Sequence, residues 1–397
     1  MAKTFVIDPN DGNRVPFLRG ILTRSLSDAG IEFDEAYRLA SRIRQALSDV
    51  DEISADALRE QVTRLLEEQQ FDRRIIEAYQ RPAPMPPPII VTDKDGQTNA
   101  FSEDQHIRCL ESSGLSSEEA EKTSRWVYQY LSEHEINQIT SARLGHLTYD
   151  CLREQLGPTV AKRYLVWIDY CHSGRPLVLL IGGTTGCGKS TIATEVAHRL
   201  GVVRTQSTDM LREVMRMMIP KRLLPILHVS AFDAWKSLPA KLSHQEDMES
   251  LISDGYRSQM ELLSVPCEAV IQRALRERVS LILEGVHVHP SLPERIDRRG
   301  DAIIVPLLLA TLKQNRLRKR LRGRGEVAPE RGGKRYLSNF DRIWALQTFL
   351  LSEADLAGVP IIANDDKEKT IVQVMRTIID AMTDKFSSTP DEVFGDE

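Results

Sequence analysis

The chain has 397 residues, 41% of them hydrophobic and 27% charged, which is enough for two or three globular domains. Its net charge of −5 argues against general nucleic-acid binding, so an anionic ligand must be met by local basic clusters. The five cysteines lack C-x-x-C spacing, the start lacks the pattern of a signal peptide, and the longest apolar run covers only residues 177–181. We therefore expect a cytoplasmic protein without a disulfide framework, a zinc site or a membrane segment.

A proline-rich stretch at residues 81–88 is the clearest domain boundary. Five prolines in seven residues exclude a helix and favour an extended, stiff spacer. We predict one domain at residues 1–80, a second at 89–174, a third at 175–385 and an acidic tail at 386–397. The tail is expected to be frayed from Asp391 onward.

The first two domains, here called repeat one (residues 1–80) and repeat two (89–174), are related by an ungapped shift of 84 positions. The shift matches Asp11-Gly12 with Asp95-Gly96, Phe17 with Phe101, Leu26 with Leu110, Gly30-Ile31 with Gly114-Leu115, Ala36 with Ala120, Ile43 with Val127 and Leu47 with Leu131. Chance similarity of amphipathic helices is the alternative, but a shared D-G turn and several core positions in one register favour an internal duplication.

Each repeat is predicted to begin as a short hairpin and to continue as helices. In repeat one the strands are residues 5–7 and 15–17, and helical spacing begins at Ile21 and again over 34–47. Ser54 is a candidate N-cap for a last helix through Leu66. Beyond Val50 the register of the two repeats drifts.

The remainder of the chain alternates predicted strands and helices. We expect a buried strand at 177–182, a helix at 190–200 ended by Gly201, a second strand at 202–203, long helices within 246–278, strands at 279–283 and 302–309, a helix at 337–357 ended by Gly358, a strand at 359–363 and a helix at 370–382. This alternation predicts an α/β fold with a parallel sheet covered by helices on both faces.

The first chemical motif is a phosphate-binding loop. The run Gly183, Thr184, Thr185, Gly186, Cys187, Gly188, Lys189 and Ser190 fits G-x-x-x-x-G-K-[ST] between a strand and a helix, and we assign it together with Thr191 to ATP. Glycines let backbone N–H groups converge on phosphate oxygens, and the helix start adds its positive dipole end. Lys189 is expected to neutralise the β- and γ-phosphates, and Ser190 to ligate Mg²⁺.

The second motif, Ser207-Thr208-Asp209, follows the predicted second strand. We expect the carboxyl end of that strand to lie beside the first strand and its loop, so that Asp209 faces the hydroxyl of the acceptor and takes its proton. Arg212 lies one helical turn later and is expected to pair with an anionic acceptor. The alternative is that Thr208 or Asp209 only caps a helix from Met210.

The third motif is Glu284-Gly-Val-His287-Val-His289 at the end of an apolar strand. Glu284 is placed to hold the Mg²⁺ shell through water. His287 and His289 are predicted to lie on the same side of an extended stretch. They lack an evident third metal ligand, so we expect His287 to hydrogen-bond a phosphate or carboxylate of the acceptor.

The fourth feature is a run of arginines between Lys313 and Arg335. Arg316 and Arg320 are one helical turn apart, and Gly323 and Gly325 favour a flexible loop after them. We interpret the run as a lid whose arginines close over the triphosphate. A solvated basic helix or an RNA-binding patch is the alternative.

Residues 182–190, the helix end His198-Arg-Leu-Gly201, residues 207–215 and 284–287 together resemble archaeal-type 2-phosphoglycerate kinase. The resemblance covers about residues 177–385. It implies a P-loop kinase that phosphorylates the free hydroxyl of 2-phosphoglycerate to give 2,3-bisphosphoglycerate. Repeats one and two resemble the ATP-cone, a small and mainly helical module, and that kinase family also carries an ATP-cone at its N-terminus.

The ATP-cone resemblance implies a regulatory nucleotide, held by a basic residue before the D-G turn. Repeat two has Lys94 there, whereas repeat one has Asn10. We therefore expect repeat two to bind the nucleotide and repeat one to pack on repeat two or on a second chain, which would make a homo-oligomer. The alternative is that both repeats only scaffold or dimerise. Two alternatives to the 2-phosphoglycerate kinase reading remain: a kinase for another small phosphorylated or polyol acceptor, and a nucleotide-sensing regulator.

Overall fold

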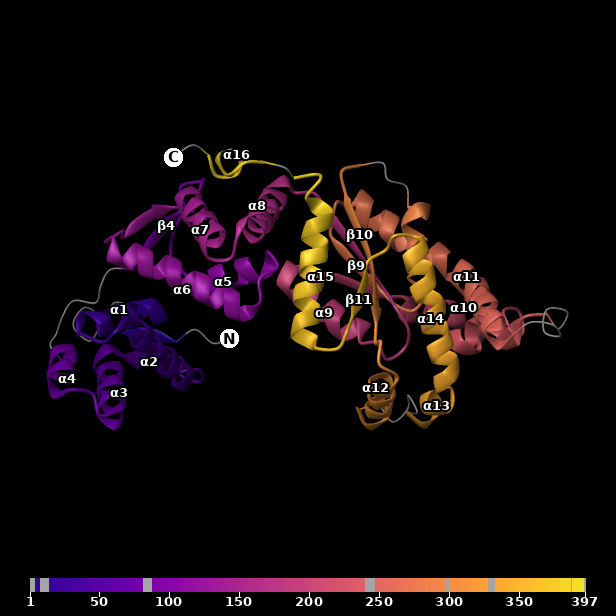
Figure 1. Ribbon diagram of the computed structural model, residues 1–397, viewed down its shortest axis with the longest axis horizontal. Coiled ribbons are helices and arrows are strands. Elements are labelled where there is room, and N and C mark those ends of the chain that lie inside the picture. The colour runs from indigo at the N-terminus through magenta and orange to yellow at the C-terminus, as the bar shows by residue number, and fades with distance from the viewer. Residues whose placement is uncertain are drawn as a thin grey trace. The chain divides into compact units, whose positions relative to one another are not determined.

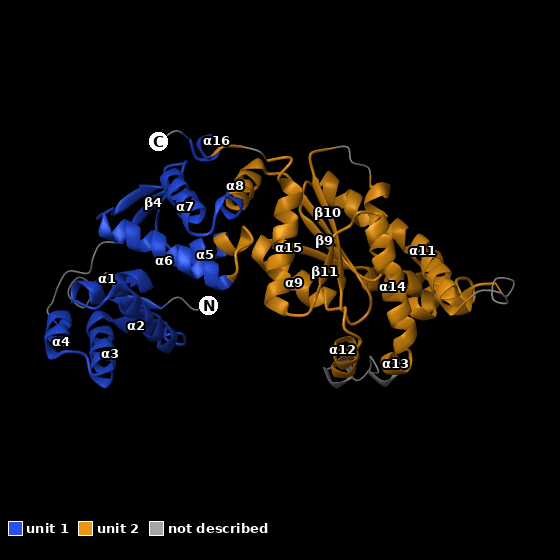
Figure 2. Cartoon of the chain, viewed as in Figure 1, with its two compact units in different colours: residues 1–109, 117–161, 390–397 blue, residues 110–116, 162–389 orange. Residues whose placement is uncertain are grey.

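The computed structural model describes residues 4–7, 14–80, 88–239, 247–296, 300–327, 333–386 and 388–395. The chain forms two compact units (Figure 2). Unit 1 comprises residues 1–109, 117–161 and 390–397, and unit 2 comprises residues 110–116 and 162–389. Most of both repeats lie in unit 1, and the longer segment of unit 2 begins at Lys162, inside a helix. The predicted domain bounds stay a prediction.

Repeats one and two have the same order of elements, which agrees with the predicted duplication (Figure 1). Repeat one contains β1 (Phe5–Ile7), β2 (Arg14–Pro16), α1 (Arg19–Asp28), α2 (Phe33–Ala46), β3 (Glu52–Ser54), α3 (Ala55–Glu68) and α4 (Arg73–Gln80). Repeat two contains β4 (Ile90–Thr92), β5 (Thr98–Ala100), α5 (Glu103–Ser112), α6 (Ser117–Glu133), β6 (Gln138–Thr140), α7 (Ser141–Gln155) and α8 (Pro158–Ser173). The predicted turn at Asp11-Gly12 lies outside the described residues.

The register of the duplication also agrees with the structure. Helix α5 begins 84 residues after α1, whereas β6 begins 86 residues after β3, so the drift starts where the sequence indicates it. The hydroxyl of Ser54 caps α3 as predicted, by accepting a hydrogen bond from Ala57 N. Each repeat adds a third strand, parallel to its first, that the sequence did not predict, and repeat one also adds the unpredicted helix α4. The ATP-cone resemblance itself stays a prediction.

Unit 2 is an α/β structure built on a five-stranded sheet in which every pair of neighbouring strands is parallel, as predicted. The strand order is β11-β10-β7-β9-β8. The strands are β7 (Leu177–Gly182), β8 (Arg204–Ser207), β9 (Leu281–Glu284), β10 (Ile303–Ala310) and β11 (Ile361–Ala363). The helices that follow α8 are α9 (Lys189–Leu200), α10 (Thr208–Met218), α11 (Met248–Arg276), α12 (Gln314–Val327), α13 (Gly333–Ser338), α14 (Phe340–Leu356), α15 (Lys367–Met382) and α16 (Pro390–Phe394), of which α16 belongs to unit 1.

Helices cover both faces of the sheet, with α9 and α15 on one side and α11 and α14 on the other (Figure 1). Successive residues of β7 point to opposite faces: Leu179 and Ile181 join the core formed with α9 and α15, while Val178 and Leu180 join the core formed with α11. Burial on both faces explains the unbroken apolar run of this strand. In the described part of the chain, no helix is long and apolar enough to span a membrane.

Two predictions about the elements of unit 2 are wrong. The second strand begins at Arg204 and not at Val202, because the N–H of Val202 donates to the carbonyl of Ala197 and closes the end of α9. This strand, β8, lies at the sheet edge beside β9, so it does not neighbour β7 as expected.

The expectation of a frayed acidic tail is wrong for its described residues. Helix α16 covers Pro390–Phe394 and packs within unit 1. The ring of Phe394 lies against that of His146 in α7, with centroids 5.1 Å apart, and the imidazole Nε2 of His146 lies 3.0 Å from the carbonyl oxygen of Gly395. A ring contact and a polar contact of this kind hold the end of the chain in place.

Candidate active site

Three strands of unit 2 end in one row at the same edge of the sheet. In the parallel register, Ile181 of β7 pairs with Glu284 of β9, and Glu284 pairs with Ser207 of β8. The loop 183–188 follows β7, and Asp209 lies two residues after Ser207. The register therefore brings the predicted phosphate loop, Glu284 and Asp209 to one place, even though β9 separates the other two strands.

The loop that follows β7 is packed tightly from its inner side. Gly188 has φ +90°, and a Cβ atom there would lie 2.4 Å from Nδ2 of Asn364. That amide donates to the carbonyl of Cys187 at 2.8 Å, and Asn364 is 3% exposed. Glycine is therefore required both by the left-handed backbone and by the approach of Asn364. The predicted residues Ser190 and Thr191 lie on the exposed side.

Lys189 is buried and points back into the loop. Its ammonium donates to the carbonyl of Thr184 at 2.8 Å and lies 4.0 Å from Sγ of Cys187. The hydroxyl of Thr184 is buried and has no hydrogen-bond partner among the residues that the structure describes. A buried, unpaired hydroxyl beside a fixed cation is a place where an anionic ligand gains hydrogen bonds at little cost.

Ser190 and Glu284 form a pair of oxygen groups beside the loop. The Ser190 hydroxyl donates to Oε1 of Glu284 at 2.9 Å. Oxygen donors of this kind suit Mg²⁺, which keeps several waters and is usually held by one or two protein groups together with substrate phosphates. No group of three or more His, Cys, Asp and Glu side chains in the described ranges could hold a metal ion by itself.

Asp209 and Arg212 lie in the first turns of α10. The hydroxyl of Ser207 caps this helix by accepting from Met210 N at 3.1 Å, so the cap is neither of the two residues considered above. The Asp209 carboxylate is 70% exposed and lies 3.5 Å from the guanidinium of Arg212. Arg212 also donates to the carbonyl of Val229 at 2.8 Å. The carboxylate is thus free of a capping role and open to a ligand.

His287 is held from behind by Gln259, in the middle of α11. The amide of Gln259 donates to the carbonyls of Ile226 at 2.5 Å and Val229 at 3.1 Å, which fixes its Oε1 toward the ring. Nε2 of His287 lies 2.8 Å from that oxygen and must therefore carry the proton. Nδ1 is then an acceptor, and it is buried without a partner among the described residues.

The charge state of His287 follows from its surroundings. Burial lowers the pKa of the imidazole to about 3, helped by the positive charge of Arg212 and opposed by the negative charge of Asp209. The ring is neutral near pH 7, and its free Nδ1 accepts a hydrogen bond. A phosphate or carboxylate, which was the expected partner, offers no proton at that pH, whereas a hydroxyl does.

His287 and His289 do not lie on an extended stretch, contrary to expectation. The N–H of Val288 donates to the carbonyl of Gly285 at 3.4 Å and closes a turn. The second imidazole, His289, instead has its Nδ1 2.8 Å from the hydroxyl of Ser291. The two rings therefore have separate partners.

The predicted lid arginines are already engaged in helix α12. Arg320 donates to the carbonyl of Cys187 at 3.2 Å and to Oδ1 of Asn364 at 3.3 Å, and Arg316 donates to the carbonyl of Asp365 at 2.5 Å. Burial lowers the pKa of the Arg320 guanidinium. The expected flexible loop at Gly323 and Gly325 is wrong, since α12 continues to Val327; residues 328–332 lie outside the described part.

Comparison with known proteins gives the family. No family model matches the chain. The chain is 35% identical over 293 residues to "2-phosphoglycerate kinase" of Pyrococcus furiosus, which covers 74% of this chain and 94% of the relative. It is 33% identical over 290 residues to the protein of the same name from Pyrococcus horikoshii, covering 73% and 93%. A third relative of that name, from Thermococcus kodakarensis, is 34% identical over 288 residues, covering 72% and 96%.

The chain belongs to the 2-phosphoglycerate kinase family. About a quarter of it lies outside the match with the Pyrococcus furiosus protein, whereas only a small part of that relative does. This member of the 2-phosphoglycerate kinase family is thus longer than that relative. The excess is comparable with one repeat of 84 positions.

The sequence analysis did not identify two supporting residues of this 2-phosphoglycerate kinase family member. Asn364 supports the loop, and Gln259 supports His287. Asn364 directly follows β11, and a buried polar residue at the end of a parallel strand is a signal that could have identified it. Gln259 is fully buried within α11, where it interrupts an apolar face. A buried amide needs partners, but the sequence gives no sign that one of them is His287, 28 residues away.

Proposed function

We propose that this chain is an ATP-dependent kinase that transfers the γ-phosphoryl group to the free hydroxyl of 2-phosphoglycerate and forms 2,3-bisphosphoglycerate. The observation that carries the proposal is the row Ile181, Glu284 and Ser207, because it gathers the loop, the oxygen pair and Asp209 at one edge. The names of the relatives support the choice of acceptor.

At the nucleotide end, the loop 183–190 and Thr191 receive the phosphates. Lys189 exchanges its hydrogen bond to the Thr184 carbonyl for phosphate oxygens, and the Thr184 hydroxyl gains a partner. Arg320 and Asn364 both bond the Cys187 carbonyl and hold the loop from the side opposite the ligand. This support makes the donors rigid before ATP binds, which is the condition for electrostatic catalysis.

Ser190 and Glu284 are the residues that fit a magnesium ion. The Ser190 hydroxyl and the Glu284 carboxylate, which are hydrogen-bonded to each other, would hold the ion, the hydroxyl as a ligand and the carboxylate through water. When bound, Mg²⁺ neutralises charge on the β- and γ-phosphate oxygens. The Ser190–Glu284 hydrogen bond keeps both groups in position when the ion is absent.

At the acceptor end, Asp209 orients the hydroxyl and receives its proton. The hydroxyl oxygen attacks the γ-phosphorus, the bond from that phosphorus to the bridging oxygen breaks, and its electron pair leaves with ADP. Arg212 binds an anionic group of the acceptor. Nδ1 of His287 is a second, neutral acceptor for the same hydroxyl and helps to align it. Asp209 is the better proton acceptor because its carboxylate is charged.

The test is ATP consumption by the full chain with 2-phosphoglycerate, 3-phosphoglycerate, glycerate or no acceptor. We expect consumption with 2-phosphoglycerate, and a product that carries two phosphate esters by ³¹P NMR. Stimulation by another of these compounds alone would contradict the choice of acceptor. Nucleotide binding without consumption under any condition would instead favour a nucleotide-sensing regulator.

A regulatory nucleotide bound at Lys94 of repeat two is a further part of the proposal. Lys94 lies exposed in the turn between β4 and β5, where Oδ1 of Asp93 accepts from the backbone N–H of Asp95 and of Gln97, both at 2.9 Å. Those bonds hold the turn and leave the lysine available for phosphate. Nucleotide stoichiometry in a Lys189→Ala chain should be one and should fall to zero with Lys94→Ala added; retention of the site in the double variant would contradict this assignment.

A further inference from the structure

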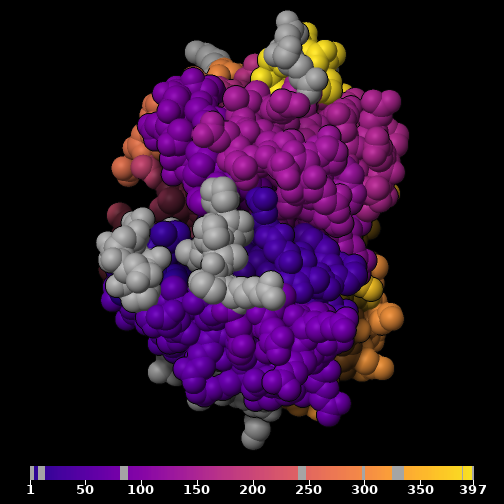
Figure 3. Space-filling view, turned by 90° about the vertical axis from the view of Figure 1, so that its left-hand side faces the viewer, coloured from indigo at the N-terminus to yellow at the C-terminus, as the bar shows by residue number. Residues whose placement is uncertain are grey.

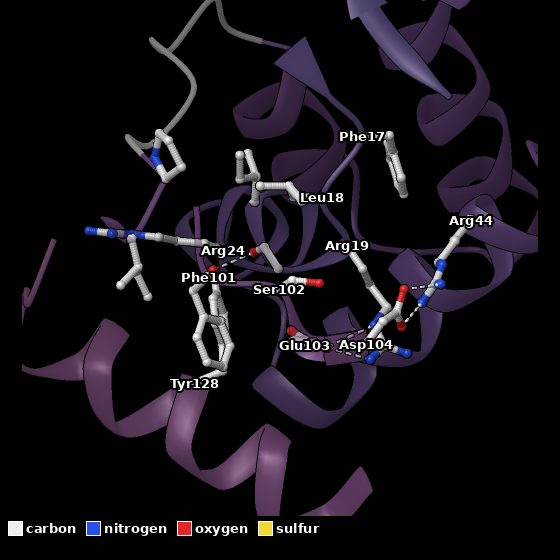
Figure 4. A pocket seen from close by; sticks show the side chains of 14 residues that line it. Phe17, Leu18, Arg19, Arg24, Arg44, Phe101, Ser102, Glu103, Asp104 and Tyr128 are labelled. Atoms are coloured by element: carbon white, nitrogen blue, oxygen red, sulfur yellow. Dashed lines mark hydrogen bonds and ion pairs between the residues drawn. The ribbon is translucent and has the colours of Figure 1, made fainter. Parts of the chain in front are cut away.

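Within unit 1, the two repeats meet at the starts of α1 and α5. Arg19 is the first residue of α1 and Glu103 the first of α5, and they occupy equivalent positions 84 residues apart. Nε of Arg19 donates to Oε2 of Glu103 at 3.0 Å, and the two side chains are 11% and 7% exposed. A buried ion pair thus joins the same position of two copies of one module (Figure 4).

A second pair of contacts shows how the repeats are related. Arg44 donates to Oδ1 of Asp104 at 2.7 Å, and the hydroxyl of Tyr128 donates to the carbonyl of Gly20 at 2.6 Å. Tyr128 is equivalent to Arg44 and Asp104 to Gly20 under the shift of 84. Exchanging the repeats therefore converts one contact into the other. Only an approximate two-fold axis does this, and it passes through the Arg19–Glu103 pair.

The residues on each side of the axis complement those of the other repeat. A Cβ atom on Gly20 would lie 2.7 Å from the ring of Tyr128, so the glycine makes room for that ring. The equivalent Asp104 instead meets the guanidinium of Arg44. At the edge, Arg125 of repeat two lies 4.0 Å above the ring of Tyr37 of repeat one and 3.3 Å from Asp34. Figure 3 shows the indigo surface of repeat one against the magenta surface of repeat two.

We propose that this is a self-recognition surface whose charges at positions 19 and 103 select repeat one as the partner of repeat two in the same chain and exclude a second copy of either repeat. Around a two-fold axis, identical repeats would place Glu103 against Glu103 or Arg19 against Arg19. Like charges held that close in a largely buried position cost far more than they would on the surface. Repeat one therefore fills, from within the chain, the surface that repeat two would otherwise offer to another molecule.

Loss of one partner should be costly because the other is left buried. Burial raises the pKa of the Glu103 carboxyl, and the charge of Arg19 lowers it again. Its second oxygen, Oε1, has no partner in the described part of the chain. Without Arg19, no positive charge lies as close to the Glu103 carboxylate. The interface must then open, or the carboxyl must take up a proton.

The test is a charge exchange in the full chain. Arg19→Glu and Glu103→Arg are each expected to speed amide exchange in α1 and α5 by about 10²-fold, the size expected for breaking a buried pair. The double exchange should restore most of the protection, because it only reverses the pair. Arg64→Glu, which reverses an exposed arginine of the same repeat paired with Glu60, is the matched control and should change exchange little.

Two results of the amide-exchange measurement would overturn the charge selection. One is a double exchange that leaves α1 and α5 as unprotected as the single variants do, and the other is an effect of Arg64→Glu as large as theirs. Molar mass by light scattering tests the choice of partner: we expect one chain at low micromolar concentration. A two-chain mass that falls to one chain in either single variant would place the contact between chains and overturn the proposal. If the single reversals fail to fold, Arg19→Gln and Glu103→Gln serve with the same readouts.

Discussion

The hydroxyl of Ser190 donates a hydrogen bond of 2.9 Å to Oε1 of Glu284, although the two residues are 94 positions apart. Ser190 lies in the first turn of α9 and Glu284 ends β9, so the contact depends on the pairing of β7 with β9. It joins the helix that follows the predicted phosphate loop to the end of β9. This contact is the geometric basis of the proposed magnesium site.

The first prediction concerns that pair. In the proposed magnesium site, Ser190→Ala removes a ligand and Glu284→Gln removes a negative charge beside the ion, so both should weaken Mg²⁺ activation by about 10- to 100-fold. The measurement is the Mg²⁺ concentration that gives half-maximal ATP consumption. Thr194→Ala, one turn further along α9, is the matched control. An unchanged magnesium requirement in both variants would remove the pair from the metal site.

The second prediction concerns Lys189. Replacement by Ala removes the buried ammonium of the loop, and phosphoryl transfer should fall by about 10³-fold because charge on the transferring group is no longer neutralised. The fold should persist, since both hydrogen bonds that the ammonium makes in the described part of the chain go to its own loop. Turnover and circular dichroism measure the two effects. The control is Lys367→Ala, whose exposed ammonium pairs with Glu195 and should leave turnover unchanged; normal turnover of Lys189→Ala would exclude the loop from catalysis.

The parts of this site that the sequence predicted are those encoded locally. The apolar run of β7, the glycines after it and the capped helix α9 are consecutive, so strand, loop and helix follow from one stretch. The duplication was readable because equivalent positions such as Ala36 and Ala120 fill equivalent cores, both 0% exposed.

The parts that were missed depend on contacts between distant segments. Strand β8 is polar and half exposed, since it is an edge strand that pairs with β9 alone, so no apolar run marks it. Helix α12 continues through two glycines because Leu317 and Leu321, both 0% exposed, anchor it beside the phosphate loop. Tertiary packing there outweighs the low helix propensity of glycine, which the sequence alone does not reveal.

The third prediction separates Asp209 from Arg212. Asp209→Asn should keep nucleotide binding and lower kcat by about 10²-fold or more, as expected for a positioned proton acceptor. Arg212→Ala should mainly raise the KM of the acceptor, because it removes binding in the ground state. Glu213→Gln changes another carboxylate of α10, one that pairs with Arg216, and should be neutral. Equal effects of Asp209→Asn and Glu213→Gln on kcat would contradict the assignment of Asp209 as the proton acceptor.

The fourth prediction compares two substitutions of His287, Asn and Gln. The side-chain amide of Asn replaces Nδ1 of the ring, and that of Gln replaces Nε2. In His287→Asn the side-chain oxygen can take the place of Nδ1, but the bond to Gln259 is lost. In His287→Gln the amide can still donate to Gln259, but the acceptor at Nδ1 is gone. If Nδ1 aligns the hydroxyl, His287→Gln should lose more kcat/KM for the acceptor than His287→Asn. The reverse order would mean that the ring only supports Gln259.

The last prediction concerns acid stability. Each unit has a buried neutral histidine: burial lowers the pKa of His106 in unit 1 to about 4 and that of His287 in unit 2 to about 3. The unfolded chain binds a proton to each near the ordinary value of about 6.5, whereas the folded chain does not, so stability rises with pH across this window.

The contribution is complete above pH 6.5 and is lost as the pH falls, by about 1.4 kcal/mol per pH unit for each histidine down to its folded pKa. Urea unfolding between pH 4.5 and 7.5 measures the slope. His106→Asn removes one titrating group and should reduce the slope by about one proton, at a cost in stability from the lost bonds to Ser124 and Thr148. Since desolvation is the cause, the difference between wild type and variant should persist in 1 M NaCl, where exposed ion pairs are screened. A slope that is the same in both proteins would show that His106 is protonated in the folded chain.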